Sequence, residues 1–138
     1  MEPARNIKEL IAWQLGSRLS DVVEQMVGKP QARQNPRLCE QIRASSDSVP
    51  ANLAEGFGRY YPRENARFVR IAKASLTETQ NHLQAGNRRD YWTAGDFEKA
   101  WRLSCRAMKA IVGYLRYLEG CHGELPPPKP PEPSAENQ

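Results

Sequence analysis

The chain has 138 residues, with 20 Lys and Arg against 16 Asp and Glu and a net charge of +4, and its length suits one domain with a sizeable core. No apolar run reaches the ~18 residues of a transmembrane helix, and the N-terminus lacks the apolar stretch of a secretory signal. The three cysteines include no Cys-x-x-Cys pair, which argues against a disulfide framework or a zinc site. We therefore expect a cytoplasmic protein with no membrane partner, metal or other cofactor.

The excess positive charge lies in the middle of the chain. Residues 29–89 hold eleven basic and five acidic side chains, which gives +6. Residues 1–28 hold three basic and four acidic side chains, and residues 90–138 hold six and seven, so that each of these segments has a charge of −1. A polyanion such as nucleic acid would be attracted first to the middle segment.

Four segments carry apolar residues at the spacing of an amphipathic helix, without a convincing strand-like alternation. The predicted helices span about residues 7–28, 36–58, 62–86 and 94–119. Because the connections are short, the simplest fold is an all-α, antiparallel up-down-up-down four-helix bundle over residues 1–123. Six of the eleven prolines lie in residues 124–138, where we expect a disordered Pro-rich tail; a polyproline ligand for a partner domain is the alternative.

The predicted helix ends carry capping signals. Asn6 with Glu9, and Thr93 with Asp96, have the three-residue spacing of a capping box. In this arrangement the first side chain accepts a hydrogen bond from a free amide of the first turn, and the second reaches back. Pro50 lies inside the second helix, where it lacks an amide donor and predicts a kink.

Basic residues recur three or four positions apart in two of the predicted helices, which places them on one face of each. Like charges so arranged repel each other by a few tenths of a kcal/mol per pair, and a purely structural surface would intersperse acids. The face binds nucleic-acid phosphates, or it is a solvated surface paired with acids of a neighbouring helix or subunit. The third helix contributes Arg59, Arg63, Arg67, Arg70 and Lys73, and the fourth contributes Lys99, Arg102, Arg106 and Lys109.

Two tyrosines, Tyr60 and Tyr61, stand at the start of the third-helix stripe. Tyrosine rings can stack on unpaired nucleic-acid bases. The pair is therefore compatible with the nucleic-acid interpretation of the stripe.

Three motifs between residues 41 and 83 resemble a known family: Q-I-R at 41–43, S-V-P-A-N-L-A-E-G-F-G-R at 48–59 and I-A-K-A-S-L-T-E at 71–78. With Trp13, they are similar to the four-helix-bundle proteins encoded in intervening sequences of large-subunit ribosomal RNA. The same bundle is used by the accessory variability determinant of diversity-generating retroelements. The resemblance covers about residues 7–119, and it departs at Ser45 and Ser46, where the family has small apolar residues, and at Ala74, where it has Gly.

The resemblance implies a short antiparallel bundle that assembles as a ring of five subunits. For the retroelement members it also implies binding of nucleic acid and of a reverse transcriptase. Composition does not show a pentamer, but five aromatic residues exceed what a thin bundle core needs, and exposed aromatics suit a subunit interface. These residues are Trp13, Trp92, Trp101, Tyr114 and Tyr117.

The second helix carries Asn52 and Glu55 on one face, just after Pro50. Glu55 and Glu78 could act as paired carboxylates in acid–base catalysis, but no His or Cys at helical spacing, metal motif or phosphate loop accompanies them. We therefore expect no catalytic residues and no enzyme activity. The alternative is a buried polar network that sets helix register. Its predicted members are Arg43, Ser48, Asn52, Glu55 and Glu78.

In this network Glu55 would pair with Arg43 or with an arginine of the third helix. Replacing Glu55 by Ala would then lower thermal stability or disperse the assembly, because buried polar groups need partners.

The basic stripes predict a non-enzymatic protein that binds RNA or an RNA–DNA hybrid through phosphates. The resemblance implies that it is an oligomeric scaffold, in the setting of a reverse transcriptase accessory protein. The alternative is a protein-interaction ring that docks a partner enzyme without contacting nucleic acid. The first interpretation requires an affinity that falls steeply with salt.

Overall fold

The computed structural model describes residues 4–121, and all regular structure in that range is helical. The prediction of an all-helical protein with four long helices is confirmed. The tail predicted for residues 124–138 lies outside the described residues. The elements are two 3-10 turns, η1 (Ile7–Glu9) and η2 (Ala32–Gln34), and four α-helices, α1 (Ile11–Val27), α2 (Pro36–Phe57), α3 (Pro62–Arg88) and α4 (Ala94–Gly120).

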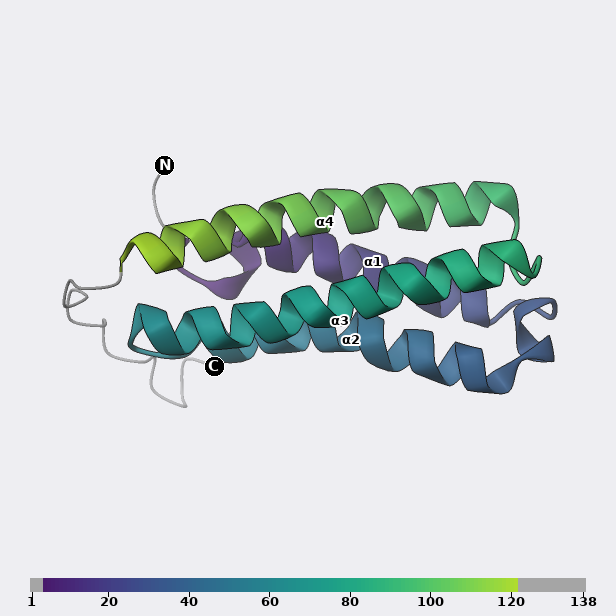
Figure 1. Cartoon of the computed structure of the whole chain (residues 1–138), viewed down its shortest axis with the longest axis horizontal. Helices are drawn as coiled ribbons and strands as arrows, with labels where there is room; N and C mark the ends of the chain where they lie inside the picture. The colour runs from purple at the N-terminus through teal and green to yellow at the C-terminus, as the bar shows by residue number, and fades with distance from the viewer. Residues whose placement is uncertain (1–3, 122–138) are drawn as a thin grey trace.

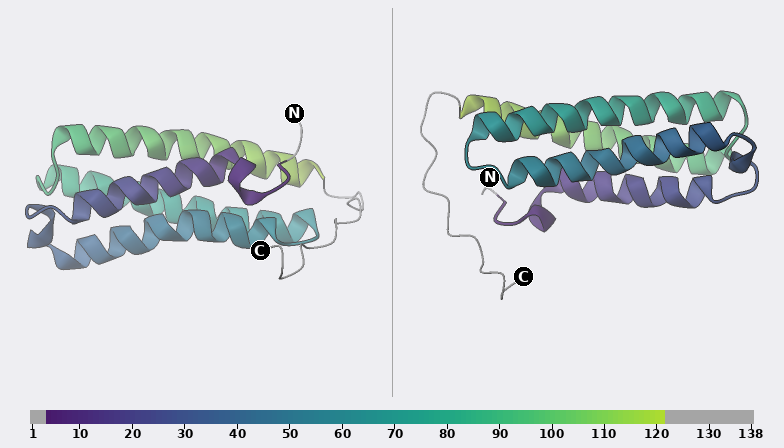
Figure 2. Two further views of the ribbon diagram at one scale, coloured as in Figure 1. Left: turned by 180° about the vertical axis from the view of Figure 1, so that it is seen from behind. Right: turned by 90° about the horizontal axis from the view of Figure 1, so that it is seen from below.

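The four helices lie side by side along the long axis of the molecule, and their connections alternate between its two ends (Figures 1 and 2). Helix α1 packs against α2 and α4, and α3 packs against the same two helices. Each apolar stripe therefore faces a single shared core.

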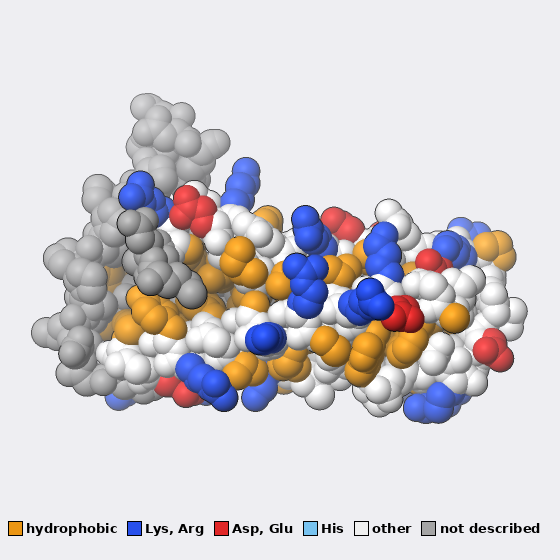
Figure 3. Space-filling view, turned by 90° about the horizontal axis from the view of Figure 1, so that it is seen from above, with side chains coloured by type: hydrophobic (Ala, Val, Ile, Leu, Met, Phe, Trp, Pro, Cys, Tyr) orange, Lys and Arg blue, Asp and Glu red, His pale blue; other side chains and the backbone are white. Residues whose placement is uncertain are grey.

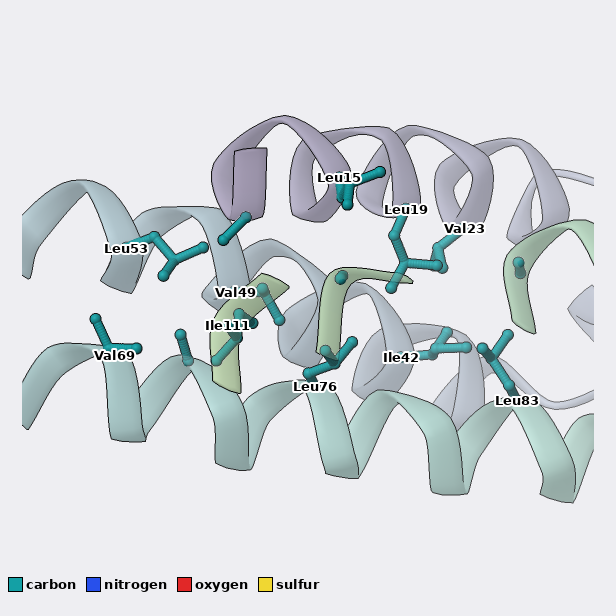
Figure 4. Close-up of a cluster of buried hydrophobic side chains, with 14 of the residues drawn as sticks. Leu15, Leu19, Val23, Ile42, Val49, Leu53, Val69, Leu76, Leu83 and Ile111 are labelled. Carbon is teal, nitrogen blue, oxygen red and sulfur yellow. The ribbon is translucent and has the colours of Figure 1, made fainter. Parts of the chain in front are cut away.

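The core is built from the apolar stripes that the helical spacing predicts. Side chains of α1, α2 and α3 point toward one another, with Ile111 of α4 among them (Figure 4). Leu19, Ile42, Leu76 and Ile111 are completely buried. Burying a side chain of this size stabilises the fold by about 1.5–3 kcal/mol relative to leaving it exposed.

The start of the first helix differs from the prediction. Asn6 caps η1, where its Oδ1 accepts a hydrogen bond from the Lys8 amide at 3.0 Å, and Glu9 accepts from the Arg5 amide at 2.7 Å. Leu10 then adopts an extended conformation (φ −76°, ψ 113°) and is buried. The capping signal therefore starts a 3-10 turn, and the α-helix begins only at Ile11.

The capping signal of the fourth helix is confirmed at its threonine. Thr93 Oγ1 accepts a hydrogen bond from the Asp96 amide at 3.1 Å. The Asp96 carboxylate does not close the box but forms an ion pair with Lys29, which ties the start of α4 to the α1–α2 connection. Gln31 donates to the Asp90 carbonyl at the same end.

The α3–α4 connection is anchored by Trp92, which is only 5% exposed. Its indole Nε1 donates to the Leu83 carbonyl at 3.1 Å, and its ring lies against Gly86 of α3. The prediction that Trp92 is a surplus aromatic suited to a subunit interface is wrong, because the ring fills the end of the core.

A Gly86→Ala substitution should destabilise the bundle. The added Cβ would lie 1.9 Å from Trp92 Cζ2, so the buried ring or the helix must shift, at a cost of about 1–3 kcal/mol. Urea unfolding followed by circular dichroism measures this cost.

The matched control is Gly113→Ala, also inside a helix, where a Cβ meets nothing within 4 Å. Because alanine favours helix more than glycine, this variant should be about 0.5–1 kcal/mol more stable than the wild type. Equal effects of the two substitutions would contradict the close packing of Trp92 on Gly86.

Candidate nucleic-acid interface

The outward face of α4 carries the predicted basic stripe. Ala100, Ser104 and Ala107 are buried, and the basic residues fall on the opposite side of the helix and are exposed. These residues are Lys99, Arg102, Arg106 and Lys109. Figure 3 looks onto the side where α4 lies uppermost in Figure 1, and basic side chains are spread along it with apolar ones between them.

Most cations on this face of α4 form no ion pair within residues 4–121. Arg102 pairs with Glu98 at 2.8 Å, and both side chains are exposed. Within residues 4–121, Lys99, Arg106 and Lys109 have no carboxylate oxygen within 4.0 Å. Their charge is therefore available to a polyanion.

An open groove between α1 and α4 adjoins this face. From α1 it is lined by Arg18 and Val22, and Leu103 is among its lining residues on α4. Arg18 adds a cation that the sequence pattern did not single out, because it stands alone on α1 and reaches the stripe only through helix packing. The remaining lining residues are Asp21, Gly95, Glu98, Lys99, Arg102 and Arg106.

The basic stripe on α3 contains one residue fewer than predicted. Helix α3 begins at Pro62, so Arg59 lies in the preceding turn and the four-residue step to Arg63 is not a helical one. The Arg59 guanidinium nevertheless returns to α3, where its Cζ lies 4.8 Å from the centroid of the Phe68 ring. Arg67 approaches the same ring at 5.7 Å.

An ion pair joins the two helices that carry the basic stripes. Arg70 of α3 contacts Glu119 of α4 at 3.0 Å, so the start of α3 lies beside the end of α4. Both side chains are about half exposed, and such surface pairs contribute only about 0–1 kcal/mol. A phosphate can therefore replace the carboxylate at little cost. Lys73 is also exposed on α3.

The carboxylates of the predicted polar network lie on the surface. Arg43 binds Glu24 of α1 through two hydrogen bonds of 2.7 and 3.0 Å, and Glu55 pairs with Arg59 at 2.6 Å. All four side chains are 43–56% exposed. Of the two predicted partners of Glu55, Arg43 is wrong, and Glu55 pairs instead with Arg59 of the predicted third-helix stripe. The prediction that these groups form a buried network is also wrong, since the helical phase of α2 directs Arg43 and Glu55 outward.

Glu78 is likewise exposed and lies 3.4 Å from His82, one helical turn away. Glu78 pairs with His82 on α3, whereas Glu55 pairs with Arg59 at the end of α2. The two carboxylates therefore do not form one catalytic site. Within residues 4–121, no group of three His, Cys, Asp or Glu is placed to hold a metal ion.

The two smaller members of the predicted network, Ser48 and Asn52, meet on α2 and contact α3. Asn52 Nδ2 donates to the Ser48 hydroxyl at 2.8 Å, and that hydroxyl contacts Ser75 of α3 at 2.8 Å. About one helical turn away, Thr79 of α3 donates to Ser45 of α2 at 2.8 Å, and both are buried. The polar contact between these helices is therefore made by neutral hydroxyl and amide groups.

Among residues 4–121, burial shifts the pKa of two ionisable groups. Burial raises the pKa of the Cys39 thiol, against the lowering effect of Arg43 and Arg33, so the neutral thiol is favoured. Burial also raises the pKa of the Tyr114 phenol, whose oxygen accepts a hydrogen bond from Asn65 at 2.7 Å.

Cys39, Cys105 and Cys121 are all free. No helix within residues 4–121 is long and apolar enough to cross a membrane.

The fold and the surface place this protein in the class of slender all-helical bundles. Exposed cations lie along its two neighbouring helices α3 and α4. Comparison with family models then identifies it: residues 8–113 match the 23S rRNA-intervening sequence protein family, and the chain belongs to that family. No curated protein matches the chain significantly.

The two kinds of polar contact predict unequal mutational costs. Glu55→Ala removes an exposed ion pair with Arg59 and should change the free energy of unfolding by less than about 0.5 kcal/mol. Thr79→Val leaves buried Ser45 without its donor and should cost about 1 kcal/mol. Urea denaturation of both variants measures the two costs, and a larger loss for Glu55→Ala than for Thr79→Val would contradict the small contribution expected of the exposed Glu55–Arg59 pair.

Proposed function

We propose that this protein is a non-enzymatic, oligomeric scaffold that binds RNA or an RNA–DNA hybrid through its phosphates. The observation that carries the proposal is the set of exposed cations on α4 (Lys99, Arg106 and Lys109) with no carboxylate within 4.0 Å in the described part of the chain. Retaining like charges on one helical face costs stability, which is explained if a polyanion neutralises them.

The α3 cations extend the same surface. Arg63, Arg67 and Lys73 are exposed and have no ion pair within residues 4–121, and Arg59 and Arg70 hold only exposed ones. Contacts of this kind recognise charge and shape, because phosphates carry no sequence information. The family name, which refers to an intervening sequence of 23S rRNA, is consistent with an RNA-related role.

Self-association belongs to the same proposal. In it, the helices of each subunit run antiparallel, up-down-up-down, and five subunits form a ring. The short connections support the first point, and exposed apolar side chains such as Ile11 (57%) and Tyr117 (56%) support self-association. Three free cysteines suit a reducing cytoplasm.

A second candidate is a docking module for a partner enzyme such as a retroelement reverse transcriptase. The α1–α4 groove favours it, because Val22 and Leu103 add apolar surface between cations. Copurification of a partner that survives nuclease treatment, together with no RNA binding by the isolated protein, would favour this candidate over the first.

Removing three free cations from α4 should weaken RNA binding and its salt dependence. The variant is Lys99→Gln/Arg106→Gln/Lys109→Gln, and losing three phosphate contacts should flatten the slope of log K against log salt by about 2 for a single strand. Titration of fluorescently labelled RNA between low and moderate salt measures both effects.

The matched control removes the same charge outside the proposed surface, from the α1–α2 connection and the helix ends beside it, through Arg33→Gln/Arg37→Gln/Arg88→Gln, all exposed residues. This control should keep most of the slope. Absence of binding by the wild type at low salt, or equal losses for the two variants, would remove the proposed interface.

A further inference from the structure

The turn between α2 and α3 exposes two neighbouring aromatic rings. Tyr60 is 39% and Tyr61 is 48% exposed, and their ring centroids lie 4.9 Å apart in an edge-to-face arrangement at 86°. The pair is therefore preorganised as two nearly perpendicular surfaces. Exposing adjacent large aromatics to water is unfavourable for an isolated fold, which suggests that they contact a ligand.

The arginines near the turn do not cover the faces of these tyrosine rings. Arg59 and Arg67 place their guanidinium groups over Phe68, at 4.8 and 5.7 Å from its centroid. Within residues 4–121, neither Tyr60 nor Tyr61 has a cation over its face. The cations are thus held beside the tyrosine rings rather than on them.

The charge around the turn favours an anion, but only weakly. Arg59, Arg63 and Arg67 face two acids, Glu55, which pairs with Arg59, and Glu64, which is exposed on the first turn of α3. Three cations against two carboxylates leave a local charge of +1. Electrostatic attraction at this end is smaller than on α4, so aromatic stacking would have to supply much of the binding.

We propose that Tyr60 and Tyr61 stack on unpaired nucleotide bases, while Arg63 and Arg67 contact the adjoining phosphates. This inference rests on the proposed function and narrows its ligand to single-stranded nucleic acid or the single-stranded loops of RNA. Bases inside a duplex are stacked on one another and offer no free face, whereas splayed bases stack readily on tyrosine. The α4 face binds phosphates of either form, and the turn selects the unpaired form.

The test compares two RNA probes of equal length, an unstructured strand and a perfect duplex, binding to the full chain. Tyr60→Ala/Tyr61→Ala should lose about tenfold in affinity for the strand and keep its affinity for the duplex. Tyr60→Phe/Tyr61→Phe keeps the rings and should restore strand binding. A strand carrying 2-aminopurine should show fluorescence quenching with the wild type and the Phe variant, and lose it with the Ala variant.

Tyr91→Ala is the matched control, since Tyr91 is a partly exposed tyrosine in the α3–α4 connection, at the end of the bundle away from the turn (Figure 1). It should leave the preference for the strand unchanged. The inference is overturned if the tyrosine pair can be replaced without loss, if strand and duplex weaken equally, or if sedimentation shows that the Ala variant changes the mass of the assembly. The last result would assign the turn to a subunit contact.

Failure of the inference can be distinguished from failure of the proposed function. A wild type that binds strand and duplex equally, with a steep salt dependence, retains the phosphate-binding function and contradicts the stacking site. A wild type that binds neither probe even at low salt removes both.

Discussion

The fold depends on four apolar helix stripes that can be buried only against one another. Each helix packs against two neighbours, so the shared core closes without any further layer. Small buried residues such as Ala72, Ala100 and Ala107 alternate with large ones such as Leu76 and Ile111, which allows the helices to interdigitate closely. Removing any one helix would expose the stripes of two others.

Because this apolar packing supplies the stability, the outer surface is free to carry other properties. The ion pairs, such as Arg43–Glu24 and Arg70–Glu119, are exposed and contribute little, and the polar contacts inside the bundle are made by neutral groups, the hydroxyls of Ser45 and Thr79 among them. The charged residues on the outward faces are therefore not constrained by folding and can serve ligand binding. The unpaired cations of α4 are consistent with a binding role.

In the proposed function, phosphate binding and base stacking would take place on separate parts of the surface. The length of α4 presents positive charge to any polyanion, and the α2–α3 turn presents aromatic rings beside a small excess of charge. The ion pair between Arg70 and Glu119 places the start of α3 beside the end of α4, so one extended strand could contact both surfaces. Long-range attraction and short-range stacking would then act on the same ligand.

The amino-acid sequence by itself determined the features that depend on local periodicity. The four helices, the Thr93 cap and the solvent-facing stripe of α4 all follow from spacings of three and four residues, because backbone hydrogen bonding repeats every 3.6 residues. Local signals were less reliable at element boundaries: Asn6 caps a 3-10 turn, and Arg59 precedes its expected helix.

Only the tertiary structure decided which distant groups meet. The burial of Trp92 against Gly86, the pairing of Arg43 with Glu24 rather than Glu55, and the position of Arg18 beside the α4 cations all depend on how the helices rotate and slide against one another. That rotation is set by the fit of many apolar side chains at once. A periodic pattern gives the face of each helix but contains no information about which residue stands opposite it.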